Sequence, residues 1–178
     1  MWWRLFVLAV MCVALGAPAA ASSFTLQTSA FLNDGMIPKV DAAAPCGGRN
    51  LTPPLLFVGF PANVRSFAIV LFDTDAGAGK GFVHWVAYGI SPTRTGLPPG
   101  FGSQASAAFV GGTNGRGDTI YFGPCPPAGQ PAHHYVFTAY ALDLAPGALP
   151  PGLARADFLV AIAGHTLAQA QINGRFGR

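Results

Sequence analysis

The segment Ser66-Phe67-Ala68-Ile69-Val70-Leu71-Phe72-Asp73 is the strongest strand signal in the chain. It is rich in β-branched and aromatic residues and contains neither Gly nor Pro. Two later segments, residues 83–90 (VHWVAYGI) and 134–142 (HYVFTAYAL), are also rich in β-branched and aromatic residues. All three are apolar at successive positions rather than alternating, which predicts central strands of a sheet that is covered on both faces.

The composition supports one sheet-rich domain. Of 178 residues, 51% are hydrophobic and 10% are charged, and the 23 Gly and 16 Pro argue against a bundle of long helices. All seven acidic residues are Asp, and a net charge of +3 is too small for a nucleic-acid-binding surface. After Pro150-Pro151 the chain becomes rich in Ala and Leu and lacks Pro, which predicts two short helices at about residues 155–163 and 165–172.

Residues 1–21 have the pattern of a secretory signal peptide. Arg4 precedes an apolar run, and Ala19-Ala20-Ala21 provides small residues at a cleavage site. The run is short for a membrane span, and no basic amphipathic helix follows it, so no stable membrane anchor is expected after cleavage. We therefore predict a single domain over residues 22–178 that is exported to the periplasm or secreted. An uncleaved anchor is the alternative, whereas the bulky Met11 disfavours lipid attachment at Cys12.

Cleavage would remove Cys12 and leave Cys46 and Cys125 as an even pair. In an oxidising compartment this pair can form a disulfide. Two buried thiols are the other interpretation.

Two aspartates lie at the end of the strongest strand. The two-residue period of a strand would send Asp73 and Asp75 to one face and Thr74 to the other. A solvated turn is the competing interpretation, because Asp followed by small residues is ordinary loop chemistry.

Histidines lie within or just before the other two strong strands. His84 is followed by Trp85 in an apolar segment, where a buried imidazole needs a hydrogen-bond partner, so a core histidine is the simplest interpretation. Alternation places His133 and Tyr135 on one side of their strand and His134 on the other, toward solvent.

A stiff loop, residues 123–129 (GPCPPAG), leads to these histidines. Together the carboxylates, imidazoles and phenol predict a small preformed polar pocket. The chain has no G-x-S-x-G elbow, P-loop or H-E-x-x-H motif and contains no Glu, which favours binding over catalysis.

Five segments, in this order, resemble motifs of the phosphatidylethanolamine-binding protein family, also called the Raf kinase inhibitor protein family, and in particular its bacterial branch. They are residues 46–55 (CGGRNLTPPL), residues 66–76 (SFAIVLFDTDA), His84-Trp85-Val86, residues 123–129, and His133 with Tyr135. The resemblance implies a mainly β fold, an antiparallel β-sandwich with a large central sheet, a smaller sheet, and short peripheral and C-terminal helices.

The resemblance also implies a pocket at the end of the sheet for a small anion or phosphoryl head group, with no cofactor. The implied ligand-binding residues are Asp73, Asp75, His84, Gly123, Pro124, Pro126, His133 and Tyr135. The chain departs from the family pattern at Thr74, Gly77 and His134, which stand where two prolines and an arginine are usual. These departures affect loop rigidity and one basic partner of the ligand.

Three functions follow as hypotheses. The first is an exported, non-catalytic binding protein that can act as a ligand-responsive inhibitor of a protein partner. Here a neighbouring Asp would keep His84 or His133 protonated near neutral pH, so that binding weakens as pH rises through about 7 to 8. The second is a protease or kinase inhibitor that acts through loops at residues 98–106 or 111–118. The third is a metal-dependent hydrolase that uses the Asp and His cluster.

Overall fold

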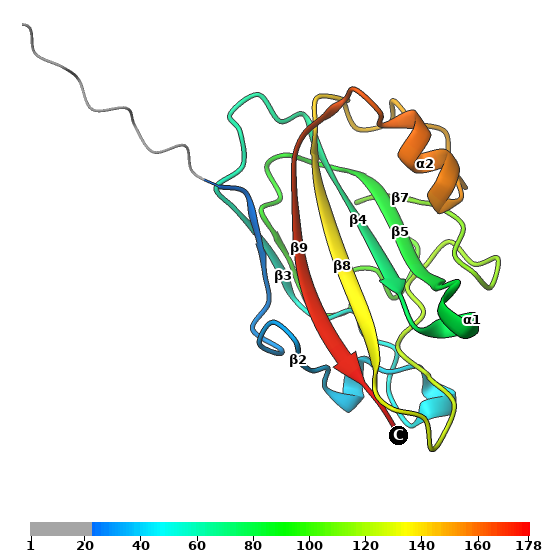
Figure 1. Cartoon of the computed structure of the whole chain (residues 1–178). Coiled ribbons are helices and arrows are strands. Elements are labelled where there is room, and N and C mark those ends of the chain that lie inside the picture. Colours follow the sequence, from blue (N-terminus) through cyan, green and yellow to red (C-terminus); the bar gives the residue numbers. More distant parts are fainter. Residues whose placement is uncertain (1–22) are drawn as a thin grey trace, which may run out of the picture.

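The computed structural model describes residues 23–178 (Figure 1). The predicted signal peptide lies outside the described residues. A six-stranded sheet and a three-stranded sheet form the fold. In spatial order the large sheet contains β2 (Gly35–Met36), β9 (Thr166–Phe176), β8 (His133–Leu142), β4 (Ser66–Asp73), β5 (Phe82–Ile90) and β7 (Val110–Gly111). The small sheet contains β1 (Thr25–Gln27), β3 (Leu55–Val58) and β6 (Gly96–Leu97).

Every pairing in the two sheets is antiparallel except that of β2 with β9. The short helical elements are α1 (Ala76–Gly79), α2 (Arg155–Ala161) and the 3-10 turns η1 (Lys39–Asp41) and η2 (Ala44–Cys46). Within the described part of the chain, no helix has both the length and the apolar character needed to cross a membrane.

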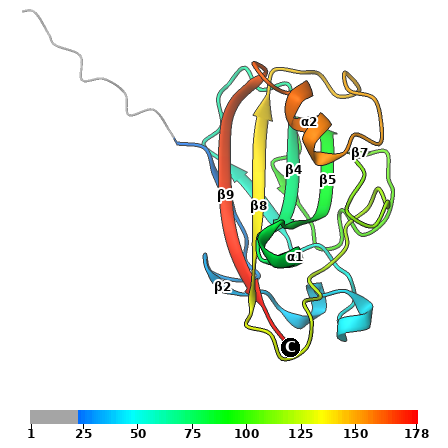
Figure 2. The same ribbon diagram turned by 45° about the vertical axis from the view of Figure 1, so that its right-hand side comes forward.

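The central strands are covered on both faces, as their apolar sequences predict. On one face Phe67 of β4 stacks on Phe57 of β3, with ring centroids 4.3 Å apart. On the other face Phe158 of α2 stacks on Tyr88 of β5 at 5.3 Å, and Figure 2 shows α2 lying across the large sheet. The predicted mainly β fold is therefore confirmed.

The second predicted C-terminal helix is wrong. Residues 166–176 form β9, which pairs with β8 from His133↔Phe176 to Leu142↔Thr166. Its side chains alternate, because Ala170 and Ile172 are buried while Gln171 is exposed. The first predicted helix is present as α2.

Strand order determines where the polar residues meet. The end of β4 lies between the start of β5 and the start of β8, since Asp73 is paired with both Phe82 and Tyr135. Residues that are far apart in sequence therefore come together at one end of the large sheet (Figure 1).

Candidate functional site

A cavity of about 550 Å³ opens at this end of the large sheet. Strands β4, β5 and β8 contribute Asp73, His84 and His133 to its wall. The complete lining is Asp73, Asp75, Ala76, Gly77, Ala78, Phe82, His84, Phe122, Cys125, Pro126, Pro127, Gln130 and His133. Five of the eight predicted ligand-binding residues thus face one cavity.

Asp73 is the hydrogen-bonding centre of the site. Its carboxylate is buried, and Oδ1 accepts hydrogen bonds from the backbone N–H groups of Asp75 (2.9 Å) and Ala76 (3.1 Å). Its Oδ2 lies 2.8 Å from Nδ1 of His133. Because these contacts occupy both oxygens, Asp73 orients the start of α1 and one imidazole rather than offering a free carboxylate to a ligand.

His133 is fixed at both ring nitrogens. Nδ1 faces the carboxylate of Asp73, which can only accept while it is ionised, so Nδ1 carries a proton. Nε2 lies 3.1 Å from Oε1 of Gln130. Both nitrogens therefore face oxygen atoms, and both hydrogen bonds form when the ring carries two N–H groups.

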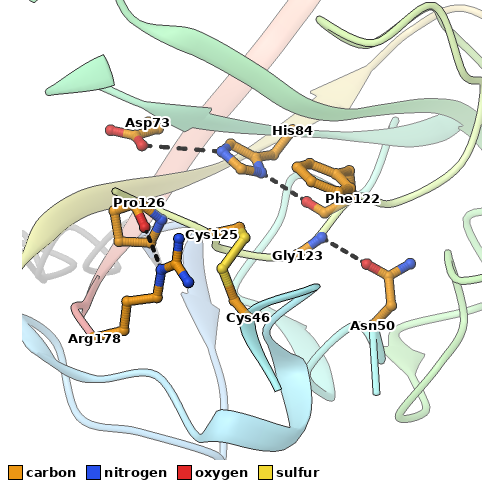
Figure 3. The surroundings of a disulfide bond; sticks show 9 residues. All are labelled: Cys46, Asn50, Asp73, His84, Phe122, Gly123, Cys125, Pro126 and Arg178. Atoms are coloured by element: carbon orange, nitrogen blue, oxygen red, sulfur yellow. Dashed lines mark hydrogen bonds and ion pairs between the residues drawn. A yellow bond between two sulfur atoms is a disulfide. The ribbon is translucent and has the colours of Figure 1, made fainter. Parts of the chain in front are cut away.

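His84 has a different environment. Its Nδ1 donates to the carbonyl oxygen of Phe122 at 2.7 Å, and its Nε2 faces Oδ2 of Asp73 at 4.0 Å (Figure 3). Burial lowers the pKa of His84 below its usual value of 6.5, and the opposing effects of the Phe122 carbonyl and Asp73 are smaller. This direction favours the neutral form of His84 near neutral pH in the free protein, which leaves His133 as the other imidazole that the sequence expectation named. In the neutral ring, Nε2 is an acceptor that makes no short contact with Asp73.

Asp75 lies on the exposed rim of the cavity. Its Oδ2 accepts hydrogen bonds from the backbone N–H of His134 (2.6 Å) and from Nδ1 of the same residue (2.8 Å). The hydrogen bond from the backbone N–H of His134 is the main cause that lowers the pKa of Asp75.

The predicted strand alternation does not extend to Asp75, because β4 ends at Asp73. The prediction that His134 faces solvent is confirmed.

The loop over residues 123–129 is tied to the N-terminal part of the fold. Cys46 and Cys125 form a disulfide rather than two buried thiols (Figure 3). The Gly123 N–H donates to Oδ1 of Asn50 at 2.8 Å. The Pro124 carbonyl accepts from the N–H of Ala43 at 3.1 Å. Gly123 and Pro124 therefore attach the loop, whereas Cys125 reaches the cavity.

Gly123 is required for a close approach. A Cβ at this position would overlap the backbone of Asp41 and Ala42. Gly123 itself lies outside the lining of the cavity, and close packing accounts for a glycine at this position.

Tyr135 lies beneath the site rather than in its wall. The side chain is buried, and its ring meets that of His84 edge-on at 5.2 Å. Burial and the neighbouring Asp73 carboxylate raise the pKa of Tyr135, so its hydroxyl stays protonated. The predicted convergence of Tyr135 with His133 on one ligand is not seen in this arrangement.

Sequence reasoning did not identify Phe82, Phe122 or Gln130 as lining residues. Phe82 could have been found, because it lies two residues before His84 and so on the same face of β5. Phe122 directly precedes the predicted loop, and its ring is stacked on His84 with centroids 5.6 Å apart. Gln130 carries no comparable signal in the sequence.

The described residues, 23–178, include no group of three or more His, Cys, Asp or Glu side chains that is placed to hold a metal ion. The third hypothesis, a metal-dependent hydrolase, therefore gains no support from the geometry of the Asp and His cluster.

Comparisons with known proteins place this geometry in context. A family model described as phosphatidylethanolamine-binding protein matches residues 27–177. A UPF0098 protein of Methanothermobacter thermautotrophicus is 39% identical over 156 residues, which cover 86% of this chain and 98% of that protein. A Mycobacterium tuberculosis protein named as a lipoprotein, LppC, is 38% identical over 161 residues, covering 88% of this chain and 74% of that protein.

Two solved structures have the same architecture. Escherichia coli YbcL, described as a member of the mammalian PEBP family, superimposes with a TM-score of 0.79 at 26% identity, and the match covers 88% of this chain and 99% of YbcL. The CT736 homologue from Chlamydia trachomatis gives a TM-score of 0.77 at 31% identity, with the same two coverages.

Proposed function

Because the chain belongs to the phosphatidylethanolamine-binding protein family, we propose that it is an exported, non-catalytic binding protein whose cavity takes a small phosphoryl group or a similar anion. The observation that carries this proposal is the arrangement around Asp73. This carboxylate bonds to two backbone N–H groups and to His133, so its charge is directed at the protein rather than at the cavity. An anion can then approach the imidazoles without meeting an unpaired carboxylate.

The two histidines complement a singly protonated phosphoryl group. Neutral His84 offers Nε2 as an acceptor, to which a P–OH group can donate. The other phosphoryl oxygens can accept from the side-chain amide N–H of Gln130. When the ring of His133 carries two N–H groups, they can also accept from its Nε2–H in place of Oε1 of Gln130; both residues line the cavity. Phe82 and Phe122 line the same cavity and provide apolar surface for the rest of an organic head group.

This arrangement couples binding to a proton. Burial lowers the pKa of His84 and so favours its neutral form in the free protein. A phosphoryl dianion that binds against this ring would then require one added proton, either on its own oxygen or on Nε2 of His84. Affinity then falls once pH exceeds both the pKa of His84, which burial lowers below 6.5, and the second pKa of the phosphoryl group, about 6 for a phosphate monoester, by up to about tenfold per pH unit. For such a monoester, this onset lies lower than the interval of about 7 to 8 that the sequence suggested.

Two observations support the proposed export. Cys46 and Cys125 form a disulfide, a bond that persists in oxidising compartments. One relative carries the name of a lipoprotein. An inhibitory role toward a protein partner stays a prediction. In the two loops suggested for it, residues 98–99, 104–106 and 115–118 are exposed.

The test uses the full chain produced in an exporting host and labelled with ¹⁵N. Inorganic phosphate, O-phosphorylethanolamine and acetate are titrated between pH about 5.5 and 8.5. His133→Ala removes an imidazole from the site. His165→Ala is its matched control, since Nδ1 of His165 also lies 2.8 Å from an aspartate oxygen, that of Asp143, outside the cavity.

We expect amide shifts around Asp73, His84 and residues 123–135 for the phosphorylated ligands. These shifts should be lost with His133→Ala and kept with His165→Ala. An affinity that does not change with pH would contradict the proton coupling. An absence of shifts in the unsubstituted protein would contradict the anion pocket itself.

A further inference from the structure

The rim of the cavity includes a turn that few contacts of its own hold in place. Pro126, Pro127 and Gln130 line the cavity, and residues 127–131 are exposed. Within the turn, the N–H of Gln130 donates to the carbonyl of Pro127 at 3.4 Å. A single long hydrogen bond of this kind cannot fix the position of the Gln130 side chain.

The two residues that follow β9 brace this turn from outside. Nε of Arg178 donates to the carbonyl of Pro126 at 2.8 Å (Figure 3), and the N–H of Gly129 donates to the carbonyl oxygen of Arg178 at 3.2 Å. Gly177 lies flat against Ala132, where an added Cβ would come within 3.1 Å of the Ala132 Cα. Arg178 is thus bonded at both ends of the segment that precedes Gln130.

Two successive contacts connect Arg178 to the ring nitrogen of His133 that faces the cavity. Arg178 fixes residues 126–129, the next residue is Gln130, and Oε1 of Gln130 lies 3.1 Å from Nε2 of His133. The same Nε2 is the atom that His133 can present to the cavity, because Nδ1 is occupied by Asp73. A shift of the turn would therefore move the partner of Nε2 and the wall formed by Pro126 together.

We propose that Arg178 is a positioning residue for ligand binding: by holding the turn at residues 126–130, it sets Gln130 against Nε2 of His133 and keeps the cavity rim in its binding arrangement. This inference rests on the proposed anion-binding function of the cavity. An arginine suits the role, because its planar guanidinium directs Nε–H at the carbonyl of Pro126 from an otherwise exposed side chain.

The chain supplies a closely matched control. Arg175 is also exposed, lies at the end of β9, and donates from Nε to a carbonyl oxygen, that of Asp34, at 2.8 Å. The two arginines thus share residue type, charge, donor atom and bond length. They differ in that Arg178 bonds to the loop that lines the cavity, whereas Asp34 is outside the lining.

The experiment compares Arg178→Ala, Arg178→Lys and Arg175→Ala with the unsubstituted full chain. The dissociation constant of inorganic phosphate is measured by NMR at pH about 6, in low salt and at about 0.5 M NaCl, where long-range attraction is screened. The side-chain amide resonances of Gln130 and the ring resonances of His133 are recorded without ligand. Thermal unfolding reports whether each variant is folded.

We expect Arg178→Ala to weaken phosphate binding by about five- to tenfold at both salt concentrations, as for the loss of a hydrogen bond to a charged donor. The Gln130 and His133 resonances should shift before any ligand is added. Arg178→Lys should recover part of the affinity, and Arg175→Ala should leave both the affinity and these resonances unchanged.

Three results would overturn the inference. These are an unchanged affinity in folded Arg178→Ala, an equal loss in Arg175→Ala, and a loss that disappears at high salt, which would indicate long-range charge attraction. If the unsubstituted protein does not bind phosphate, the proposed function fails first. In that case, unshifted Gln130 and His133 resonances in Arg178→Ala would refute the positioning role separately.

Discussion

Replacing Asp41 by Asn should stabilise the chain more at pH 7 than at pH 4. Asp41 ends η1, is only 4% exposed, and its Oδ2 is buried without a hydrogen-bond partner among the described residues. Burial raises the pKa of this carboxyl from 3.8 to about 6. The folded chain therefore resists ionisation of Asp41 more than the unfolded chain does.

The sign and size of the effect follow from this pKa. Below pH 3.8 the carboxyl is protonated in both states, and its contribution to folding stability is fully present. As pH rises through about 6, that contribution is lost, because the unfolded state releases its proton first. A rise in pKa from 3.8 to about 6 corresponds to about 3 kcal/mol, and relaxation of the chain and entry of water around the ionised carboxyl reduce the expected loss to about 1–2 kcal/mol.

The assay is urea unfolding of the unsubstituted chain and of Asp41→Asn, with the disulfide intact, at several pH values from about 4 to about 8. Any cost of burying the amide of Asn is common to every pH. The difference between the two proteins, taken at pH 7 relative to pH 4, therefore isolates the ionisation of Asp41. All other titrating groups are shared and cancel.

We expect the stability of Asp41→Asn relative to the unsubstituted chain to rise by about 1–2 kcal/mol from pH 4 to pH 7, with a midpoint between 3.8 and about 6. A relative stability that is constant with pH would refute the reasoning. So would a relative stability that falls as pH rises, since that would mean that the ionised carboxylate stabilises the fold.

Two further predictions concern the attachment of the site loop. Replacing both Cys46 and Cys125 by Ser opens a loop with a sequence separation of 79 and should lower the free energy of unfolding by about 4 kcal/mol, as measured by chemical denaturation; a loss below about 1 kcal/mol would contradict the loop-closure estimate. Gly123→Ala forces the loop away from Asp41 and should weaken phosphate binding while the protein stays folded, whereas unchanged binding would show that the loop tolerates the shift.

Much of the fold could be predicted because the central strands carry strong local signals. The segments at residues 66–73 and 83–90 are apolar on both faces, and the structure buries them between β3 and α2. The segment that forms β9 misled the prediction, because its Ala, Leu and Gln residues favour helices. Its two-residue alternation was present in the sequence, and pairing with β8 outweighed intrinsic propensity.

The candidate site was only partly predictable, for a physical reason. Residue types and strand ends identified Asp73, His84 and His133, since antiparallel strands bring such ends together. Whether a side chain enters the cavity depends on contacts that no local pattern encodes. Tyr135 shares a strand face with His133 yet lies beneath it, and Gln130 reaches the cavity through a turn held by Arg178.

The hydrogen bond between Asp73 and His133 joins residues 60 apart in sequence. The two side chains meet only after β8 has paired with β4 in the correct register, and a slip by one residue would place them on opposite faces of the sheet. Such long-range pairing is slow compared with the formation of local turns. The Asp73 to His133 wall of the cavity therefore forms only in correctly paired molecules. Under the proposed function, an anion would bind and stabilise those molecules and leave misregistered ones unprotected.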